Sequence, residues 1–112
     1  MERTYKTWGE KWNIFKNDLC EVSILYLKPQ QRCSWHTHRT KYNQFFVIRG
    51  EVIIKTEWGE AIIHQGQTFT VRPGEPHEFQ TGDINAVLHE IMYVMYDPED
   101  IQRETLGGPI NG

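Results

Sequence analysis

The sequence has no long hydrophobic run, few cysteines and no excess of basic residues, and each shortage excludes a class of protein. No apolar stretch approaches the roughly 18 residues that a membrane-spanning helix needs, so no membrane is expected as a partner. The 12 Lys and Arg against 15 Asp and Glu give a formal charge of −3. Nucleic acid is therefore not an expected partner either, because phosphate binding needs a clustered basic face. With no apolar signal segment at the N-terminus and only two cysteines, we expect a cytoplasmic protein.

Helical periodicity is also nearly absent. No window places apolar residues at i, i+3, i+4 and i+7 over three turns. The one helical candidate is residues 98–106, with Asp97 as an N-cap and two glycines as a stop. A chain of 112 residues is long enough for one compact domain and too short for two. We therefore expect a single domain over residues 1–112 with a short C-terminal tail.

Short apolar and β-branched runs, bounded by turn-forming residues, account for most of the chain. This pattern is typical of an all-β barrel or a double-sheet sandwich, because each run has the length of a strand and stops at Gly, Pro or Asp. The expected strands are residues 21–27, 44–49, 51–55, 61–64, 67–71, 77–80 and 85–96.

Three histidines give the clearest chemical signal. His36 and His38 are two residues apart, so on an extended segment both rings project from the same face with Cβ atoms about 7 Å apart. A metal ion needs at least a third ligand, and His77 begins a strand directly after a rigid turn with two prolines. A lone strand histidine is more often a partly buried polar residue, but this pair with a third histidine favours a metal site.

The ligand types limit the choice of metal. Imidazole nitrogen without thiolate suits iron, zinc, manganese, nickel or copper, and ligand softness cannot choose among them. Three protein ligands with open positions are typical of a catalytic divalent metal rather than a closed structural one. The expected cofactor is therefore a divalent metal ion of unassigned identity.

Two segments resemble the motifs of the cupins. The first runs from His36-Thr37-His38 through Asn43 to Gly50, and the second from Gly66 through Arg72-Pro73-Gly74 to His77. In cupins, the two histidines of the first motif and the one of the second bind a divalent metal inside a small β-barrel. The resemblance thus implies a cupin-type double-stranded β-helix, or jelly-roll barrel, with a metal at His36, His38 and His77.

Shorter stretches resemble one branch of that family. Residues 6–9, Glu90-Ile91, residues 97–103 and Gly107 are similar to type II mannose-6-phosphate isomerases. This likeness implies a sugar phosphate as substrate, with its carbonyl and adjacent hydroxyl oxygens bound to the metal. A base would then shift a proton through an enediolate, and Glu78, His89 and Lys41 are candidates for it, although His89 is more readily a core histidine.

The sequence departs from the cupin pattern at one chemically important position. Most metal-binding cupins carry a glutamate ligand where this chain has Asn43, which strand alternation turns into the site. An amide oxygen is a weak neutral ligand, so either Asn43 or water is expected at the fourth position. Three neutral imidazoles leave the 2+ charge uncompensated, which favours an anionic or chelating small molecule. Gln30, Arg72 and Thr81 also depart from the pattern, and turn or surface variation is expected there.

These observations leave three functions open. The first is a metal-dependent cupin acting on a small polar or anionic molecule such as a sugar phosphate. The second is a non-haem iron dioxygenase with a three-histidine site, and the third is a binding module without turnover. A homodimer is expected because short barrels with exposed edge strands gain from pairing, and the segment through Phe15 is the candidate for exchange across its interface.

Other polar residues carry weaker expectations. Cys33 is expected to pack as a small apolar side chain and His64 to be solvated. The cationic side chains Lys41, Arg49 and Arg72 could attract a phosphate if they face the barrel mouth, but solvated surface charge is the simpler interpretation of each.

Overall fold

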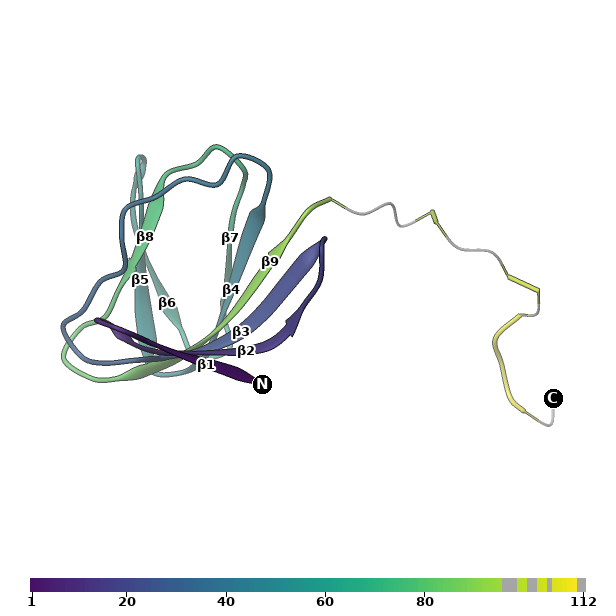
Figure 1. Ribbon diagram of the computed structural model, residues 1–112, viewed down its shortest axis with the longest axis horizontal. Helices are drawn as coiled ribbons and strands as arrows, with labels where there is room; N and C mark the ends of the chain where they lie inside the picture. The colour runs from purple at the N-terminus through teal and green to yellow at the C-terminus, as the bar shows by residue number, and fades with distance from the viewer. Residues whose placement is uncertain (96–98, 101–102, 105, 111–112) are drawn as a thin grey trace.

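The structure is a computed structural model that describes residues 1–95, 99–100, 103–104 and 106–110 (Figure 1). All regular elements in these residues are β-strands. They are β1 (Glu2–Lys6), β2 (Gly9–Lys16), β3 (Cys20–Leu27), β4 (Tyr42–Arg49), β5 (Glu51–Thr56), β6 (Gly59–His64), β7 (Thr68–Val71), β8 (His77–Gln80) and β9 (Ala86–Tyr93).

The strands form two antiparallel sheets that face each other (Figure 1). One sheet has six strands in the order β1-β2-β3-β9-β4-β7, and the other has three in the order β6-β5-β8. The expected all-β fold of two sheets is confirmed. Of the expected helix, residues 98, 101–102 and 105 lie outside the described residues, and the described residues in that range form no helix. No helix in the described part of the chain is long and apolar enough to cross a membrane.

Strand alternation places the core between the two sheets. In β3, Ser23, Leu25 and Leu27 are buried, and in β9 so are Leu88, Glu90 and Met92, because side chains two apart share a face. The main core cluster is Leu25, Leu27, Cys33, Phe45, Val47, Val52, Ile54, Ile63, Val71, Phe79, Ala86 and Leu88.

The N-terminal hairpin of β1 and β2 was not among the expected strands. β2 pairs along β3, with Lys11 opposite Leu25 and Asn13 opposite Ser23. Its inward positions are therefore partly polar, which removes the apolar alternation that identifies a strand. A register shift between Asn13 and Phe15 interrupts the pattern further. In this structure the hairpin pairs with its own chain, and its exchange in a dimer remains a prediction.

The structure shows the local setting of the three minor departures from the cupin pattern. Gln30 has φ +57°, a left-handed conformation that glycine adopts most readily. The Arg72 N–H donates to Glu75 Oε1 at 2.8 Å, a bond that a proline there could not make. Thr81 was expected to be turn or surface variation. It lies directly after β8, outside any strand, but it is not a surface position, because it is buried at 7% exposure and its hydroxyl donates to the Lys28 carbonyl at 2.6 Å.

Candidate metal centre

The loop that carries His36 and His38 runs beside β8. His36 and His77 are paired residues of an isolated antiparallel bridge, with the His36 N–H donating to the His77 carbonyl at 3.1 Å and the reverse bond at 2.9 Å. The Cys33 N–H adds a bond to the Phe79 carbonyl at 3.1 Å. Two segments that are distant in the sequence are therefore held side by side, and the turn before β8 delivers His77 directly opposite His36.

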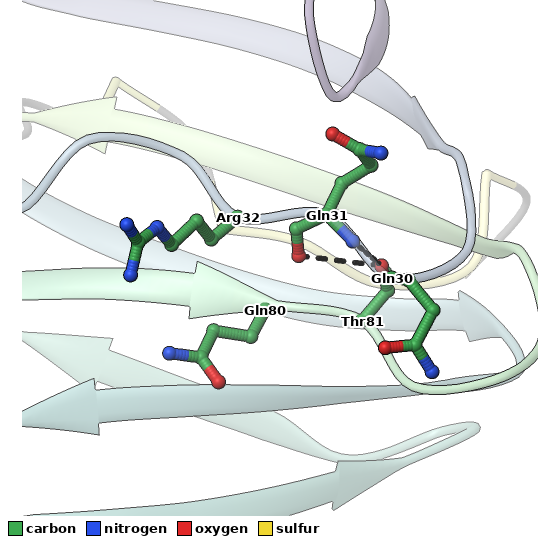
Figure 2. Close-up of a pocket in the computed structure, with 5 residues that line it drawn as sticks. All are labelled: Gln30, Gln31, Arg32, Gln80 and Thr81. Atoms are coloured by element: carbon green, nitrogen blue, oxygen red, sulfur yellow. Dashed lines mark hydrogen bonds between the residues drawn. The ribbon is translucent and has the colours of Figure 1, made fainter.

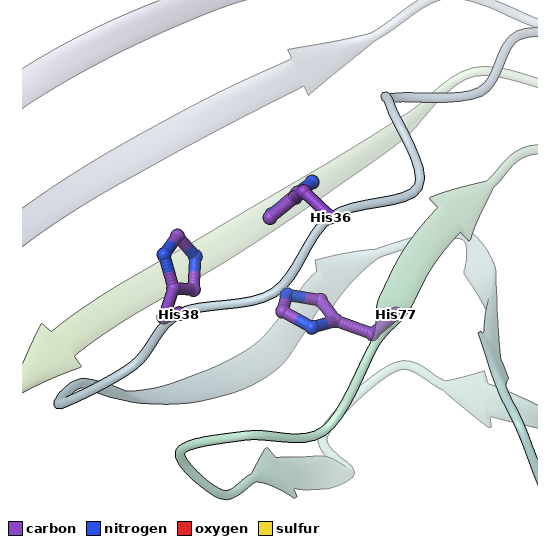
Figure 3. A group of neighbouring side chains, drawn as sticks. All are labelled: His36, His38 and His77. Carbon is purple, nitrogen blue, oxygen red and sulfur yellow. The ribbon is translucent and has the colours of Figure 1, made fainter.

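The three histidine rings converge on one point (Figure 3). One ligand nitrogen from each of His36, His38 and His77 lies within 4.8 Å of the others. The ring centroids are 4.5 Å apart for His36 and His77, 4.9 Å for His36 and His38, and 5.5 Å for His38 and His77. Nitrogens at about 2.0–2.1 Å from one ion cannot be more than about 4.2 Å apart, so only a small inward shift is needed for the three to share an ion.

Hydrogen bonds to backbone carbonyls select the ligating nitrogen in two of these rings. Nδ1 of His36 lies 2.7 Å from the Ser34 carbonyl, and Nδ1 of His77 lies 3.0 Å from the Glu75 carbonyl. A carbonyl oxygen only accepts, so each Nδ1 carries the proton and each Nε2 keeps its lone pair. This is the arrangement that orients metal-binding histidines in proteins.

Burial keeps two of the rings neutral. Desolvation lowers the pKa of His38 to about 4, with smaller contributions from His36, His77 and Lys41. Desolvation is also the main cause that lowers the pKa of His77. At neutral pH both rings are therefore unprotonated, as a metal ligand must be.

Three buried side-chain atoms in the described part of the chain have no hydrogen-bond partner. They are His38 Nε2, His77 Nε2 and Asn43 Oδ1. An unpaired buried polar atom costs about 1–3 kcal/mol, so each one needs an explanation. All three belong to residues expected to be ligands from the sequence. Asn43 Oδ1 carries lone pairs, His77 Nε2 keeps one because Nδ1 is the protonated nitrogen, and His38 Nε2 carries one when its proton is on Nδ1. A divalent cation fits this donor set, because it would accept these lone pairs.

Asn43 lies in β4 with its side chain buried at 1% exposure. It shares the inner face of the strand with Phe45, whose ring centroid is 6.3 Å from that of His77. Its Nδ2 donates to Glu90 Oε2 at 3.1 Å. The amide is thus fixed on its nitrogen side and unpaired on its oxygen side.

Sequence reasoning did not assign Glu90 to the site. Glu90 lies on β9 opposite Ser23 and Phe45, and burial raises its pKa to about 7, a shift that Lys11 and the Asn43 hydrogen bond reduce. The signal that could have placed Glu90 at the site is the alternation of side chains along β9. Glu90 falls between Leu88 and Met92 on the inward face of that strand. A single carboxylate in such a row is a candidate functional group.

The other candidate bases are not gathered with the three histidines. Glu78 and His89 lie on the faces of β8 and β9 opposite to those of His77 and Glu90, because each directly adjoins an inward residue. Glu78 is buried and accepts a bond from Gln80 Nε2 at 3.2 Å, whereas His89 is half-buried. Lys41 is exposed in the loop before β4 and close enough to lower the pKa of His38. Of the three, only Lys41 is near the cluster.

The remaining polar candidates behave as expected. Cys33 is part of the core and accepts a bond from the Phe79 N–H at 3.2 Å. Burial raises the pKa of its thiol to about 11, so it is not a thiolate at neutral pH. His64, Arg49 and Arg72 are exposed.

A polar pocket lies between the loop after β3 and the end of β8 (Figure 2). It is an open pocket of about 370 Å³ lined by Gln30, Gln31, Arg32, Gln80 and Thr81. Gln80 faces away from His77 by strand alternation, and the lining contains no histidine or carboxylate. This pocket therefore offers no metal ligands of the kind found in the cluster.

Comparisons with solved structures support the fold. The chain is similar to TT1209 from Thermus thermophilus, with a TM-score of 0.73, 20% identity, and coverage of 81% of this chain and 89% of that one. KdgF from Halomonas sp. gives a TM-score of 0.76 at 8% identity, covering 86% and 90%. A sugar phosphate isomerase of the cupin superfamily, SPO2919 from Silicibacter pomeroyi, gives 0.61 at 17% identity, covering 70% of this chain and 52% of that one.

The sequence itself identifies the family. A search of curated proteins finds no match. The family model for the cupin domain matches residues 23–92, which is more than half of the chain and includes every residue of the histidine cluster. This chain belongs to the cupin domain family.

Proposed function

We propose that this protein is a metal-dependent cupin that binds a small, oxygen-rich anion, such as a sugar phosphate, through an ion held by His36, His38 and His77. The observation that carries the proposal is the convergence of three histidine nitrogens within 4.8 Å. Two of these rings have Nδ1 bound to a backbone carbonyl and so present Nε2. Core packing does not explain such a cluster, because it leaves buried ring nitrogens of His38 and His77 without hydrogen-bond partners.

The charge of the site favours an anionic ligand. Three neutral imidazoles and one neutral amide place no negative charge in direct contact with a divalent ion. When bound, the ion supplies Lewis-acid polarisation of a ligand oxygen. Lys41 adds a positive side chain beside His38, where it would attract the phosphate of an approaching ligand.

The reaction that we propose is isomerisation of a sugar phosphate. The likeness of the motifs and tail to mannose-6-phosphate isomerases supports it, and a solved cupin of similar fold is titled a sugar phosphate isomerase. The reaction needs a group that moves a proton between adjacent carbons. Glu78 and His89 face away from the cluster, so Lys41 is the candidate that we retain from the sequence, and it would have to lose its proton before it could act as the base.

Elemental analysis of protein purified without a histidine tag tests the metal site. We expect one stoichiometric divalent ion in the unaltered protein and its loss in His77→Ala, because His77 supplies one of three protein ligands. His64→Ala is the matched control: His64 is exposed and its ring lies 3.3 Å from Glu51, so its removal should leave the metal content unchanged. An equal metal content in His77→Ala would refute the proposed site.

Activity assays then separate the three functions. Interconversion of aldose and ketose phosphates, lost in His77→Ala, would support the isomerase. Substrate-dependent oxygen uptake with bound iron would instead identify an oxygenase. Tight binding of a sugar phosphate with no product under any metal would identify a binding module.

A further inference from the structure

The inner wall beside the metal site contains one buried carboxylate. Glu90 is 9% exposed and projects from β9 between Leu88 and Met92. Its cross-strand neighbours are Ser23 on β3 and Phe45 on β4, and its hydrogen-bond donor is Asn43 Nδ2 at 3.1 Å. Phe45 in turn contacts His77 edge-on, with ring centroids 6.3 Å apart. Glu90 therefore lies behind the site and reaches it through Asn43.

The hydrogen bond to Glu90 determines which way the Asn43 amide faces. Glu90 Oε2 faces the NH₂ group of the amide, which is the arrangement that an ionised carboxylate requires, because its oxygens only accept. The oxygen of the same amide is then turned away from Glu90, and it is buried without a partner. The other two unpartnered buried atoms of the described residues are Nε2 of His38 and Nε2 of His77. Asn43 shares the inner face of β4 with Phe45, whose ring centroid is 6.3 Å from that of His77, so its oxygen is on the side of the strand that faces the histidines.

We propose that Glu90 is a positioning residue of this metal site: it holds the Asn43 amide with Oδ1 toward the ion and supplies, from behind the ligand, the negative charge that an amide lacks. This inference rests on the metal site of the proposed function and adds a residue to it. The carboxylate and the ligand atom, which other metal sites combine in one side chain, are divided here between two neighbouring strands.

Glu90 acts through Asn43 rather than as a ligand itself. Among the described residues, the cluster of potential ligand atoms contains His36, His38 and His77 but not Glu90. Hydrogen-bonded carboxylates behind metal ligands fix the orientation of those ligands, and their loss typically lowers metal affinity by about 10–100-fold. A negative charge behind the ligand also offsets part of the charge of the ion.

The pair can be tested by exchanging the two functional groups. Glu90→Gln removes the charge, Asn43→Asp places two carboxylates together, and the double variant Asn43→Asp/Glu90→Gln returns one carboxylate and one amide in reversed order. The probe is Co²⁺ added to protein stripped with a chelator. Affinity is measured by competition with a chromophoric chelator, and the d–d absorption spectrum of Co²⁺ reports on its ligands.

We expect Glu90→Gln to bind Co²⁺ about 10–100-fold more weakly and with an altered d–d spectrum. The double variant should regain at least the unaltered affinity, because the amide introduced on β9 can donate to the carboxylate introduced on β4, which faces the ion. A purely structural role for Glu90 would overturn the inference, and it predicts unchanged affinity and spectrum in Glu90→Gln. If Glu90→Gln does not fold, the double variant provides the test. A Co²⁺ affinity of the double variant no better than that of Asn43→Ala would refute the proposed role of Glu90 in positioning the side chain at position 43.

His77→Ala distinguishes a failure of this inference from a failure of the proposed function. If His77→Ala binds Co²⁺ as tightly as the unaltered protein, the histidine site itself is refuted. If His77→Ala loses the ion but Glu90→Gln keeps full affinity and an unchanged spectrum, the site stands and only the role of Glu90 is refuted.

Discussion

The inner face of the six-stranded sheet has two halves of opposite character on the same strands. The apolar half consists of Leu25, Leu27, Val47, Ala86 and Leu88, all at most 2% exposed. The polar half consists of Asn13, Glu21, Ser23, Asn43 and Glu90. The register aligns Leu25, Leu88 and Val47 across β3, β9 and β4 in the apolar half. In the polar half Ser23 lies opposite Glu90, and the apolar ring of Phe45, opposite Glu90 on β4, lies at the boundary between the halves.

The two halves differ in how completely their atoms are paired. The apolar half joins the core cluster with residues of β5 and β8. In the polar half, Asn13 donates to Glu21 at 3.0 Å and to Ser23 at 3.3 Å, but the oxygen of Asn43 has no partner. One half of the same strands thus maximises stability, whereas the other retains an unfavourable buried group. The proposed metal site would account for this difference, and the predictions below test the division.

The largest effect on stability is expected in the apolar half. Leu88→Ala should lower the free energy of unfolding by about 3 kcal/mol, because it leaves a cavity where a fully buried side chain was. Urea denaturation measures the change. Ile62→Ala on β6 is the matched control, since Ile62 is 55% exposed and should cost less than about 1 kcal/mol. A large drop in metal affinity in folded Leu88→Ala would show that the halves are not independent.

The next largest effect is on how the free energy of unfolding of the metal-free protein depends on pH. Burial raises the pKa of Glu90 to about 7 from 4.5, so the folded protein keeps a proton that the unfolded chain releases. Stability from this group is present below about pH 4.5 and is lost as the pH rises through 7, by roughly 3 kcal/mol in all. Glu90→Gln should abolish this loss in urea denaturation with a chelator present, and a curve parallel to that of the unaltered protein would contradict the prediction.

His38 gives the stability of the metal-free protein a pH dependence of the opposite sign, which the same urea denaturation measures. Its pKa falls to about 4 from 6.5, so its contribution to stability is present above about pH 6.5 and is lost as the pH falls toward 4. Glu90→Gln should keep this acid-side loss, which serves as the internal control.

The smallest effect is expected inside the hydrogen-bonded network of the polar half. Ser23→Ala removes an acceptor from the Asn13 amide, which keeps its bond to Glu21. The expected loss of stability is about 1 kcal/mol, the usual net value of one such bond. Thermal unfolding of the metal-free protein measures it, and a loss as large as that of Leu88→Ala would mean that this half contributes to folding as strongly as the apolar one.

The sequence predicted the central strands because their apolar residues alternate over runs bounded by turn residues. It did not predict β1 and β2, whose inward positions include Lys11 and Asn13. The same alternation turned Asn43 inward, and Asn43 is buried at 1% exposure; its role as a ligand remains a prediction. Alternation along β9 places Glu90 on the inward face with Leu88 and Met92, whereas its neighbour His89 faces the other side.

Local chemistry alone determined which side chains share a face, because the two-residue period of a strand is a property of the backbone. The sequence pattern therefore predicts the strands and the common direction of the His36 and His38 side chains. Only the tertiary structure decided that His77 lies opposite His36 and that Asn43 donates to Glu90, a residue 47 positions away. Such pairings depend on the register between distant strands, which is set by the packing of the whole core and by no single segment.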